Sequence, residues 1–308
     1  MSKKQVVGSM SEWSGVLKDF FRQISDGSLT LEHIIDVNEH RNPFEGEAGE
    51  NWIDQIINRE HQYHLNFFGR KINLPKFEKT LKKYGQKQIR QWQKLGLEPH
   101  FLPKAFLFQS NNNFPGWKIK PNNWYYEKAA QDKILRYVDG ELEIDRQSDK
   151  LEEITVLIDT RLKPAYNDGR QMYANDNLLG PIIELLRKDK KIAKYEHGLR
   201  SSRFGVSADE WENQIKPVLA KKLGLEINQV RLERVIEANV IPQLYTDMPR
   251  KDDGNTNTWV WFEEYFKGRV RRPGGGRSSG YGGLADVCCS WSAYHWYSHG
   301  SFRPLIVL

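Results

Sequence analysis

The last eight residues of the sequence read Ser301-Phe302-Arg303-Pro304-Leu305-Ile306-Val307-Leu308. A short apolar run that follows a proline is typical of a buried strand, because no polar side chain interrupts its packing. We therefore predict that residues 305–308 form a buried strand that completes the domain. Phe302 and Arg303, immediately before this strand, are candidates to anchor the preceding chain.

The segment before this strand differs in composition from the rest of the chain. Glycine is frequent in residues 269–283, and residues 287–299 consist mainly of Cys, Ser, Trp, Tyr, His and Ala. Lys, Glu, Gln and Met number 68 in residues 1–267 and do not occur in the 41 residues that follow. About ten would be expected from average composition. The low β-propensity of Lys and Glu would reduce these types but does not explain the loss of all four.

Two interpretations of this segment stay open. Tyr and Trp offer large, rigid contact area and Ser offers adaptable hydrogen bonds, which together are typical of a ligand-contacting surface. The alternative is a small buried β-hairpin rich in aromatic residues, because large rings also fill cores. A ligand-contacting surface requires a backbone that is held by other residues, and we assign this role to the glycines, Phe302, Arg303 and the closing strand.

Parts of this region resemble a known family. The segments Gly282 to Val287, Trp291 to Ala293 and Ser301 to Leu308 resemble the variable region of target proteins of diversity-generating retroelements. Four upstream segments are similar to one bacterial branch of the same family: residues 157–161, 167–173, 202–206 and 255–259. The resemblance covers about half of the chain, residues 151–308. It departs from the family at Ser301, where glycine is frequent.

The resemblance implies an α+β fold, with a C-type-lectin-like C-terminal domain over residues 151–308 and a variable region of about residues 274–308. A mainly helical region, residues 1–150, precedes it, and its role stays unassigned. In this family, adenines of a template copy are randomised during reverse transcription. Asparagine codons that keep a pyrimidine in third place then never yield Lys, Glu, Gln, Met or Trp. The implied function is a non-enzymatic, hypervariable surface that binds a macromolecule, which we expect to be a protein.

The resemblance also implies site residues. The variable, ligand-binding positions are expected at Asp286, Cys288, Cys289, Ser290, Ala293, Tyr294, His295, Tyr297, Ser298 and His299. The scaffold of the site is expected at Gly282, Gly283, Trp291, Trp296, Phe302 and Arg303. Trp291 and Trp296 are assigned to the scaffold because the randomised codons cannot encode tryptophan; the alternative is that these two positions are encoded differently.

Capping signals and hydrophobic spacing predict the other elements. Ser9 with Glu12 and Ser207 with Glu210 have capping-box spacing, and Gly224 is a candidate C-cap. Helices are also expected near residues 52–57, over 74–95, and over 178–191 with Ile182, Ile183, Leu185 and Leu186 inward; a strand is expected over 154–158. Residues 230–240 fit either a strand or a helix. The polar, acidic stretch 139–150 is the predicted domain boundary.

The net charge of +6 is concentrated in one of these helices. The segment from Lys76 to Lys94 carries seven basic residues and a single acid, Glu78. Such a helix predicts either a nucleic-acid-binding surface or a solvated helix face, and the sequence leaves both open.

No catalytic motif is found, so we expect a protein that is not an enzyme and uses no cofactor or metal. Cys288 and Cys289 are adjacent, which fits neither zinc-ligand spacing nor the separated cysteine pair of formylglycine-generating enzymes, an alternative of the same fold. Glu60, His61 and His64 are more simply explained as core or surface residues than as metal ligands. The calcium-dependent sugar motifs of true lectins are absent. With no signal peptide or apolar span, we expect a cytoplasmic protein, and export by another route stays open.

Overall fold

The structure is a computed structural model of the chain. It describes residues 17–18, 20–22, 24–25, 31, 51–107, 113–118, 123–138, 140–160, 166–167, 170–171, 176–245, 259–267, 271–275, 289–298 and 300–308. The chain divides into two compact units, Met1–Ile56 and Ile57–Leu308, and each is described by itself. No helix within the described ranges is long and apolar enough to cross a membrane.

The first unit is helical where it is described. Residues 17–18, 20–22, 24–25 and 31 are in helical conformation. The helix α3 (Asn51–Phe68) begins in this unit and continues into the second. Its position confirms the helix expected near residues 52–57, whereas the capping-box pair Ser9 and Glu12 lies outside the described residues.

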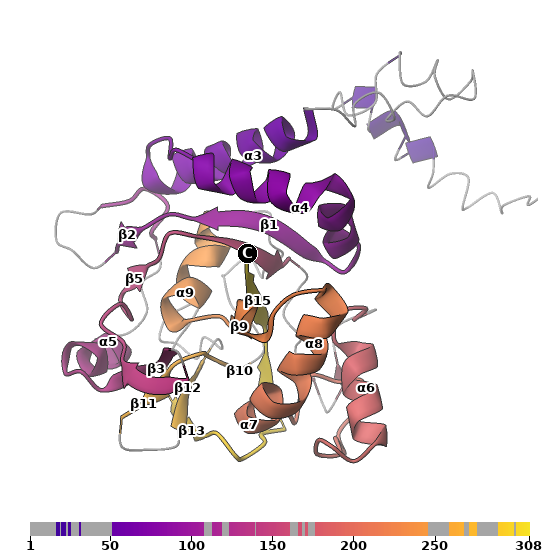
Figure 1. The fold of residues 1–308 in the computed structure, drawn as a ribbon, viewed down its shortest axis with the longest axis vertical. Coiled ribbons are helices and arrows are strands. Elements are labelled where there is room, and N and C mark those ends of the chain that lie inside the picture. Colours follow the sequence, from indigo (N-terminus) through magenta and orange to yellow (C-terminus); the bar gives the residue numbers. More distant parts are fainter. Residues whose placement is uncertain are drawn as a thin grey trace, which may run out of the picture. The chain divides into compact units, whose positions relative to one another are not determined.

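A four-stranded antiparallel sheet lies at the centre of the second unit (Figure 1). Its strand order is β1 (Leu97–Leu102), β6 (Ile154–Asp159), β15 (Pro304–Val307) and β9 (Val230–Leu232). The predicted strand over residues 154–158 is confirmed. The closing strand is confirmed as well, because Leu305 and Ile306 are fully buried and pair with Ile158 and Leu157 of β6.

Two further sheets and two ribbons surround the central sheet. The second sheet has the order β13 (Cys289–Ser292), β12 (Arg271–Gly275), β10 (Trp259–Trp261) and β14 (Gly300–Phe302), and its β10–β14 pair is parallel. The third has the order β11 (Tyr265–Phe266), β3 (Ile134–Val138) and β4 (Glu141–Ile144). The ribbons pair β2 (Ala105–Phe106) with β5 (Lys150–Leu151) and β7 (Tyr166–Asn167) with β8 (Arg170–Gln171). The chain is therefore an α+β protein.

Capping signals mark the start of α7 and the end of α8. Ser207 caps α7 (Ala208–Glu210) with the full capping box, which confirms the predicted pair with Glu210. The chain continues through a π-helical turn, Trp211–Ile215, into α8 (Lys216–Leu223), which ends at Gly224 with φ 70°. The other helices are α4 (Pro75–Lys94), α5 (Asn123–Ala130), α6 (Gly180–Lys188) and α9 (Val235–Leu244), with a 3-10 turn at Ile227–Gln229.

One inward assignment on α6 is wrong. Ile182, Ile183 and Leu186 are buried as predicted, but Leu185 is 54% exposed. The fourth side chain of the buried face is instead the charged residue Arg187. Because 100° separates successive residues of a helix, a face centred on Ile183 and Leu186 places Leu185 on the opposite side.

The polar stretch 139–150 lies within the second unit. Part of it forms β4, which pairs with β3, and β3 pairs in turn with β11 from the C-terminal half. The central sheet also joins both halves of the chain, because all six residues of β1 pair with β6. Residues 97–151 and 154–308 therefore share sheets across the boundary predicted near residue 150. Within the described part of region 1–150, the strands β1 to β4 and the helix α5 follow α3 and α4.

A buried apolar cluster fixes the sheet against its helices. It joins α9, α3 and one face of the central sheet through residues that include Phe67, Val156, Ile158, Ile241 and Leu305. A second cluster joins α9 to α5 and the second sheet, with Tyr125, Val235, Val260 and Phe262 among its members. The region left open in sequence, 230–240, is both types of element: β9 ends at Leu232 and α9 begins at Val235.

Candidate functional site

The turn between β13 and β14 carries most of the described candidate residues. Its backbone is held from outside at three places. The Asp209 amide donates to the carbonyl oxygen of Ala293 at 2.9 Å, and the Gly205 amide donates to that of Gly300 at 3.3 Å. Between them, the hydroxyl of Tyr195 donates to the carbonyl oxygen of Ser298 at 3.3 Å. The backbone is thus held at Ala293, Ser298 and Gly300 by contacts that do not depend on the side chains of the turn.

The side chains of this turn are mostly open to solvent. Tyr294 is 66% exposed and Trp296 is 39% exposed, and His295 is exposed as well. The His295 ring stacks on Trp296 with 4° between the ring planes, and it meets Tyr297 edge-on at 4.9 Å between centroids. The rings of His295, Trp296 and Tyr297 thus lie against one another, and with the exposed Tyr294 they form a mostly exposed patch that we call the aromatic turn (residues 294–297). Trp296, expected in the scaffold, belongs to this exposed patch.

Two neighbours of the aromatic turn behave differently. Ala293, expected at a ligand-binding position, is buried, and its carbonyl oxygen rather than its methyl group makes the recorded contact to α7. Tyr297 and Ser298 are half-buried, and the Tyr297 ring lies 5.8 Å from the ring of Trp261. The exposed side chains of the turn are therefore those at 294–296, with Tyr297 at its edge.

Phe302 and Arg303 anchor the chain after the turn. Phe302 is fully buried against the ring of Trp211, with 5.0 Å between centroids. Arg303 is also buried, and its Nη1 donates to the carbonyl oxygen of Asp159 at 2.8 Å. The side chain of Asp159 in turn forms an ion pair with the fully buried Arg203, 3.0 Å away. The end of β6 and the start of β15 are thus joined by side chains as well as by strand pairing.

Several expected site residues lie outside the described part of the chain: Asp286, Cys288, His299, Gly282 and Gly283. For Cys289, Ser290 and Trp291 only the backbone is described. It runs along β13, where Cys289 pairs with Gly274 and Trp291 pairs with Arg272. Ser301, the departure from the family, is fully buried, and its hydroxyl has no hydrogen-bond partner among the described residues.

A groove adjoins the aromatic turn at Tyr294. Its volume is about 790 Å3, and sequence analysis did not identify it. The lining comes from four distant segments: the β3–β4 hairpin, the helical stretch 209–216, the loop before β9, and residues 263–265. Tyr294 and Ala293 complete one side. The groove lies within the size range of small-ligand sites, and only its edge at the turn was accessible to sequence reasoning.

The charges that line this groove are largely paired. Lys216 donates to Glu212 at 2.9 Å, and Glu212 also accepts from the buried Arg272 at 2.9 Å. Burial acts to raise the pKa of Glu212, but the two cations hold it below its usual value. Glu263 differs, because burial and the neighbouring Glu212 raise its pKa. The groove is therefore polar and close to neutral, and no group in it is arranged as an obvious nucleophile–base pair.

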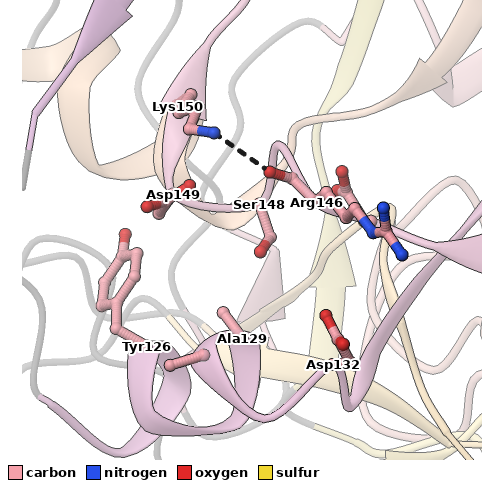
Figure 2. Close-up of a pocket in the computed structure, with 9 residues that line it drawn as sticks. Tyr126, Ala129, Asp132, Arg146, Ser148, Asp149 and Lys150 are labelled. Atoms are coloured by element: carbon pink, nitrogen blue, oxygen red, sulfur yellow. Dashed lines mark hydrogen bonds between the residues drawn. The ribbon is translucent and has the colours of Figure 1, made fainter.

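A second hollow of about 410 Å3 lies between α5 and the turn that follows β4 (Figure 2). Asp132 extends from the end of α5 toward Arg146, and Lys150 Nζ donates to the Arg146 carbonyl oxygen at 3.3 Å (Figure 2). Three aspartates line this hollow, at positions 132, 145 and 149. The structure nevertheless groups no three His, Cys, Asp or Glu side chains as metal ligands anywhere in the described ranges.

The residues Glu60 and His64, noted from sequence, lie in a buried hydrogen-bonded cluster. Glu60 accepts from the Tyr245 hydroxyl at 2.8 Å, from the Phe101 amide at 2.9 Å and from His100 Nδ1 at 3.0 Å. His64 Nε2 lies 2.9 Å from the carbonyl oxygen of Phe101. Burial alone would raise the pKa of Glu60, but the two histidines lower it to about 2. The carboxylate of Glu60 is thus engaged by three protein donors, and this geometry supports a structural role.

Comparisons with known proteins give no match for this chain. No family model, no curated protein sequence and no solved structure matches it.

Proposed function

We propose that this chain is a ligand-binding protein diversified by a retroelement, with its binding surface at the aromatic turn on a C-type-lectin-like scaffold. The observation that carries the proposal is the separation between side chains and backbone at this turn. Tyr294, His295 and Trp296 are exposed, whereas the turn's backbone is held by Asp209, Tyr195 and other residues outside it. Side chains at 294 and 295 can therefore change without loss of the contacts that shape the turn.

Composition supports the same proposal. Aromatic rings give contact area at a low cost in side-chain entropy, and they dominate hot spots in protein interfaces. The absence of Lys, Glu, Gln and Met after residue 267 matches the codons that adenine randomisation would produce. The buried Phe302 and Arg303 lie at the positions where the resembled family has its fixed Phe-Arg-Pro ending.

The test is genomic. The complete source genome should contain a reverse-transcriptase gene near this gene, together with a repeat of its 3′ end that differs at template adenines. The differing codons should include those for Tyr294 and His295 and should spare those for Phe302 and Arg303. A complete genome without such a repeat would remove the main support for the proposal.

A second candidate function rests on α4. Its basic residues Lys76, Lys79, Lys82, Lys83, Lys87, Arg90 and Lys94 are all exposed. Seven positive charges and the single acid Glu78 give this helix a net charge of +6, which equals that of the whole chain, so the remaining residues sum to zero. Lys79, Lys87, Arg90 and Lys94 form no hydrogen bond or ion pair with the described residues. An unneutralised basic face of this kind favours sequence-independent contact with nucleic-acid phosphates.

The two halves of α4 present their basic residues on the side opposite to the buried ones. Gly85, with φ 73° and ψ 161°, separates the halves. Phe77 and Leu81 are buried in the first half, and Ile89 and Trp92 in the second. No aromatic residue of α4 is both exposed and on the basic side, so base stacking is not expected, and a duplex held through its phosphates is the favoured ligand.

Salt dependence tests this second function. In the full chain, the triple variant K79Q/K87Q/R90Q should bind a random-sequence DNA duplex more weakly than wild type. A plot of the logarithm of the binding constant against the logarithm of the salt concentration should have a slope that is smaller in magnitude by about 3, since each phosphate contact contributes roughly 0.9. A variant that removes three exposed lysines elsewhere, K133Q/K221Q/K267Q, is the control and should keep the wild-type slope. Equal slopes in all three proteins would mean that α4 is a solvated face only.

A further inference from the structure

A third hollow, of about 630 Å3, lies beside the C-terminal end of α6. It is lined by five basic side chains and by no acidic one: Arg187, Lys188, Lys190, Lys194 and Arg200. Tyr195, Ile192 and Gly198 complete the lining. The groove at Tyr294 is lined by equal numbers of acidic and basic residues. The third hollow therefore differs from that groove in its net positive charge as well as in its location. We call this feature the basic hollow.

The positive charge of the basic hollow is poorly neutralised by the described residues. Arg187 makes four hydrogen bonds, and all four acceptors are backbone carbonyl oxygens, in residues 193–204. Lys188, Lys190 and Arg200 form no ion pair within the described ranges. Lys194 approaches Glu196 only at 3.9 Å, and both side chains are largely exposed.

Arg187 is buried, which raises the free-energy cost of its positive charge. Desolvation lowers the pKa of Arg187 to about 10, even though Glu210 partly offsets it. The guanidinium therefore stays charged at neutral pH, and its four hydrogen-bond acceptors are all neutral carbonyl oxygens. A buried charge that is bonded only to neutral acceptors is stabilised further by an anion nearby.

The basic hollow is also joined to the aromatic turn. Tyr195 lines the hollow, and its hydroxyl donates to the carbonyl oxygen of Ser298 at 3.3 Å. The Arg187 guanidinium lies 5.5 Å from the centroid of the Tyr195 ring. One side chain thus contacts both the cationic lining and the end of the turn.

We propose that the basic hollow is an anion-binding subsite beside the aromatic turn, which takes a phosphate or carboxylate group of the ligand. The anion site itself stands on the lining residues alone, and its use by the ligand of the turn rests on the proposed function. In this arrangement the hollow supplies a fixed electrostatic contact, while the turn supplies the contacts that change from one copy of the protein to another.

Calorimetric titration of the full chain at low ionic strength tests the anion site. Inorganic pyrophosphate and citrate are the two probes, and they distinguish phosphate from carboxylate preference. Wild type should bind at least one of them saturably at one site. The variant K190Q/K194Q/R200Q should bind it about tenfold more weakly or worse, because three cations are removed. These side chains are exposed, so circular dichroism should show an unchanged fold.

The control for this titration is K133Q/K221Q/K267Q, which removes three exposed lysines outside both the basic hollow and α4 and so has the same loss of charge. It should bind the probe as wild type does, which separates a localised site from general attraction to a basic protein. Equal weakening in both variants, or no saturable binding of either probe by wild type, would overturn the anion site. Saturable binding that is lost only in the hollow variant supports it.

The link to the turn has a separate readout. Pyrophosphate or citrate, whichever binds, should shift the backbone amide resonances of Tyr195 and Ser298 in parallel with the calorimetric saturation. Unmoved Ser298 resonances would overturn the link even if the anion binds. Because none of these measurements depends on a template repeat in the genome, failure of the subsite and failure of the retroelement proposal are distinguishable.

Discussion

The hydroxyl of Tyr195 reaches across from the loop after α6 and donates to the carbonyl oxygen of Ser298, 3.3 Å away. These residues are 103 positions apart in the sequence. The bond holds the C-terminal end of a turn whose own side chains are largely exposed. Removing this bond therefore tests how strongly the scaffold stabilises the conformation of the turn.

Removal of this hydroxyl should loosen the turn without unfolding the protein. We expect Tyr195→Phe to lower the free energy of unfolding by about 0.5–1.5 kcal/mol, the usual net value of one hydrogen bond. Backbone amides near residue 298 should exchange hydrogen faster than the fall in global stability alone would explain. Tyr294→Phe removes the same group from an exposed ring and should leave stability unchanged within about 0.5 kcal/mol. If both variants melt alike, the bond does not hold the turn.

Gly205 allows the close packing that brings Tyr195 into place. Its φ is +68°, and an added Cβ would lie 2.7 Å from Tyr195 Cδ2. Gly224 has nearly the same φ, +70°, but an added Cβ there meets nothing within 4 Å. Gly224→Ala should therefore cost about 1 kcal/mol for the backbone alone. Gly205→Ala should cost roughly 2–4 kcal/mol because overpacking adds to it, and chemical denaturation of the two variants measures the difference.

The comparison of Gly205 with Gly224 also shows what the sequence could predict. Gly224 follows a helical stripe of apolar residues, so local spacing was enough to assign it as a C-cap. Ser207 and Glu210 were assigned correctly for the same reason. The need for glycine at position 205 comes from its φ of +68° and from the ring of Tyr195, which packs against it from the loop after α6. A single sequence holds no record of such contacts.

The candidate site divides in the same way. The aromatic turn and its anchor Phe302 were accessible because composition changes abruptly along the chain near them. The groove at Tyr294 and the basic hollow were not, since their walls are assembled from segments that only the fold brings together. The burial of Arg187 on α6, where Leu185 was expected, has a similar cause. The carbonyl oxygens that accept from Arg187, between Ala193 and Phe204, belong to the loop after the helix.

Ser301 departs from the resembled family's ending, and its buried hydroxyl gives a test of that position. Its hydroxyl is buried and has no hydrogen-bond partner among the described residues, which costs free energy. Ser301→Ala removes that group at nearly constant volume. We expect it to raise the free energy of unfolding by up to about 1 kcal/mol, measured by urea denaturation. A clear loss of stability would show that the hydroxyl has a partner.

Glu264 should make stability fall as the pH rises toward neutrality. It is fully buried, and desolvation raises its pKa from 4.5 to about 7, although Arg234 and the Val235 amide act against this. A group with a raised folded-state pKa stabilises the protein fully below its unfolded value and loses this contribution as the pH rises through the folded value. The contribution of Glu264 should thus disappear between about pH 4.5 and pH 7.

Glu264→Gln checks this sign. The variant should lose the component of pH dependence in that window, worth roughly 3 kcal/mol at most, while Glu60 still causes a loss of stability below pH 4.5 because its pKa is lowered to about 2. Thermal melts across the pH range measure both slopes. A wild-type protein that gains stability steadily from pH 4.5 to pH 7, with the same slope in the variant, would contradict the assignment to Glu264.

The last prediction concerns tolerance in the aromatic turn. Simultaneous replacement of Tyr294 and His295 by serine should change the free energy of unfolding by less than about 1 kcal/mol, because exposed positions usually contribute less than about 0.5 kcal/mol each. Phe302→Ala should cost about 3–5 kcal/mol, since it empties the fully buried space against Trp211. Binding of a ligand selected on the wild-type protein should show the opposite pattern. The double variant should bind it more weakly, and a folded Phe302→Leu variant should bind it as wild type does. If the double variant unfolds while Phe302→Ala melts like wild type, the turn is part of the core, and the proposed binding surface is in the wrong place.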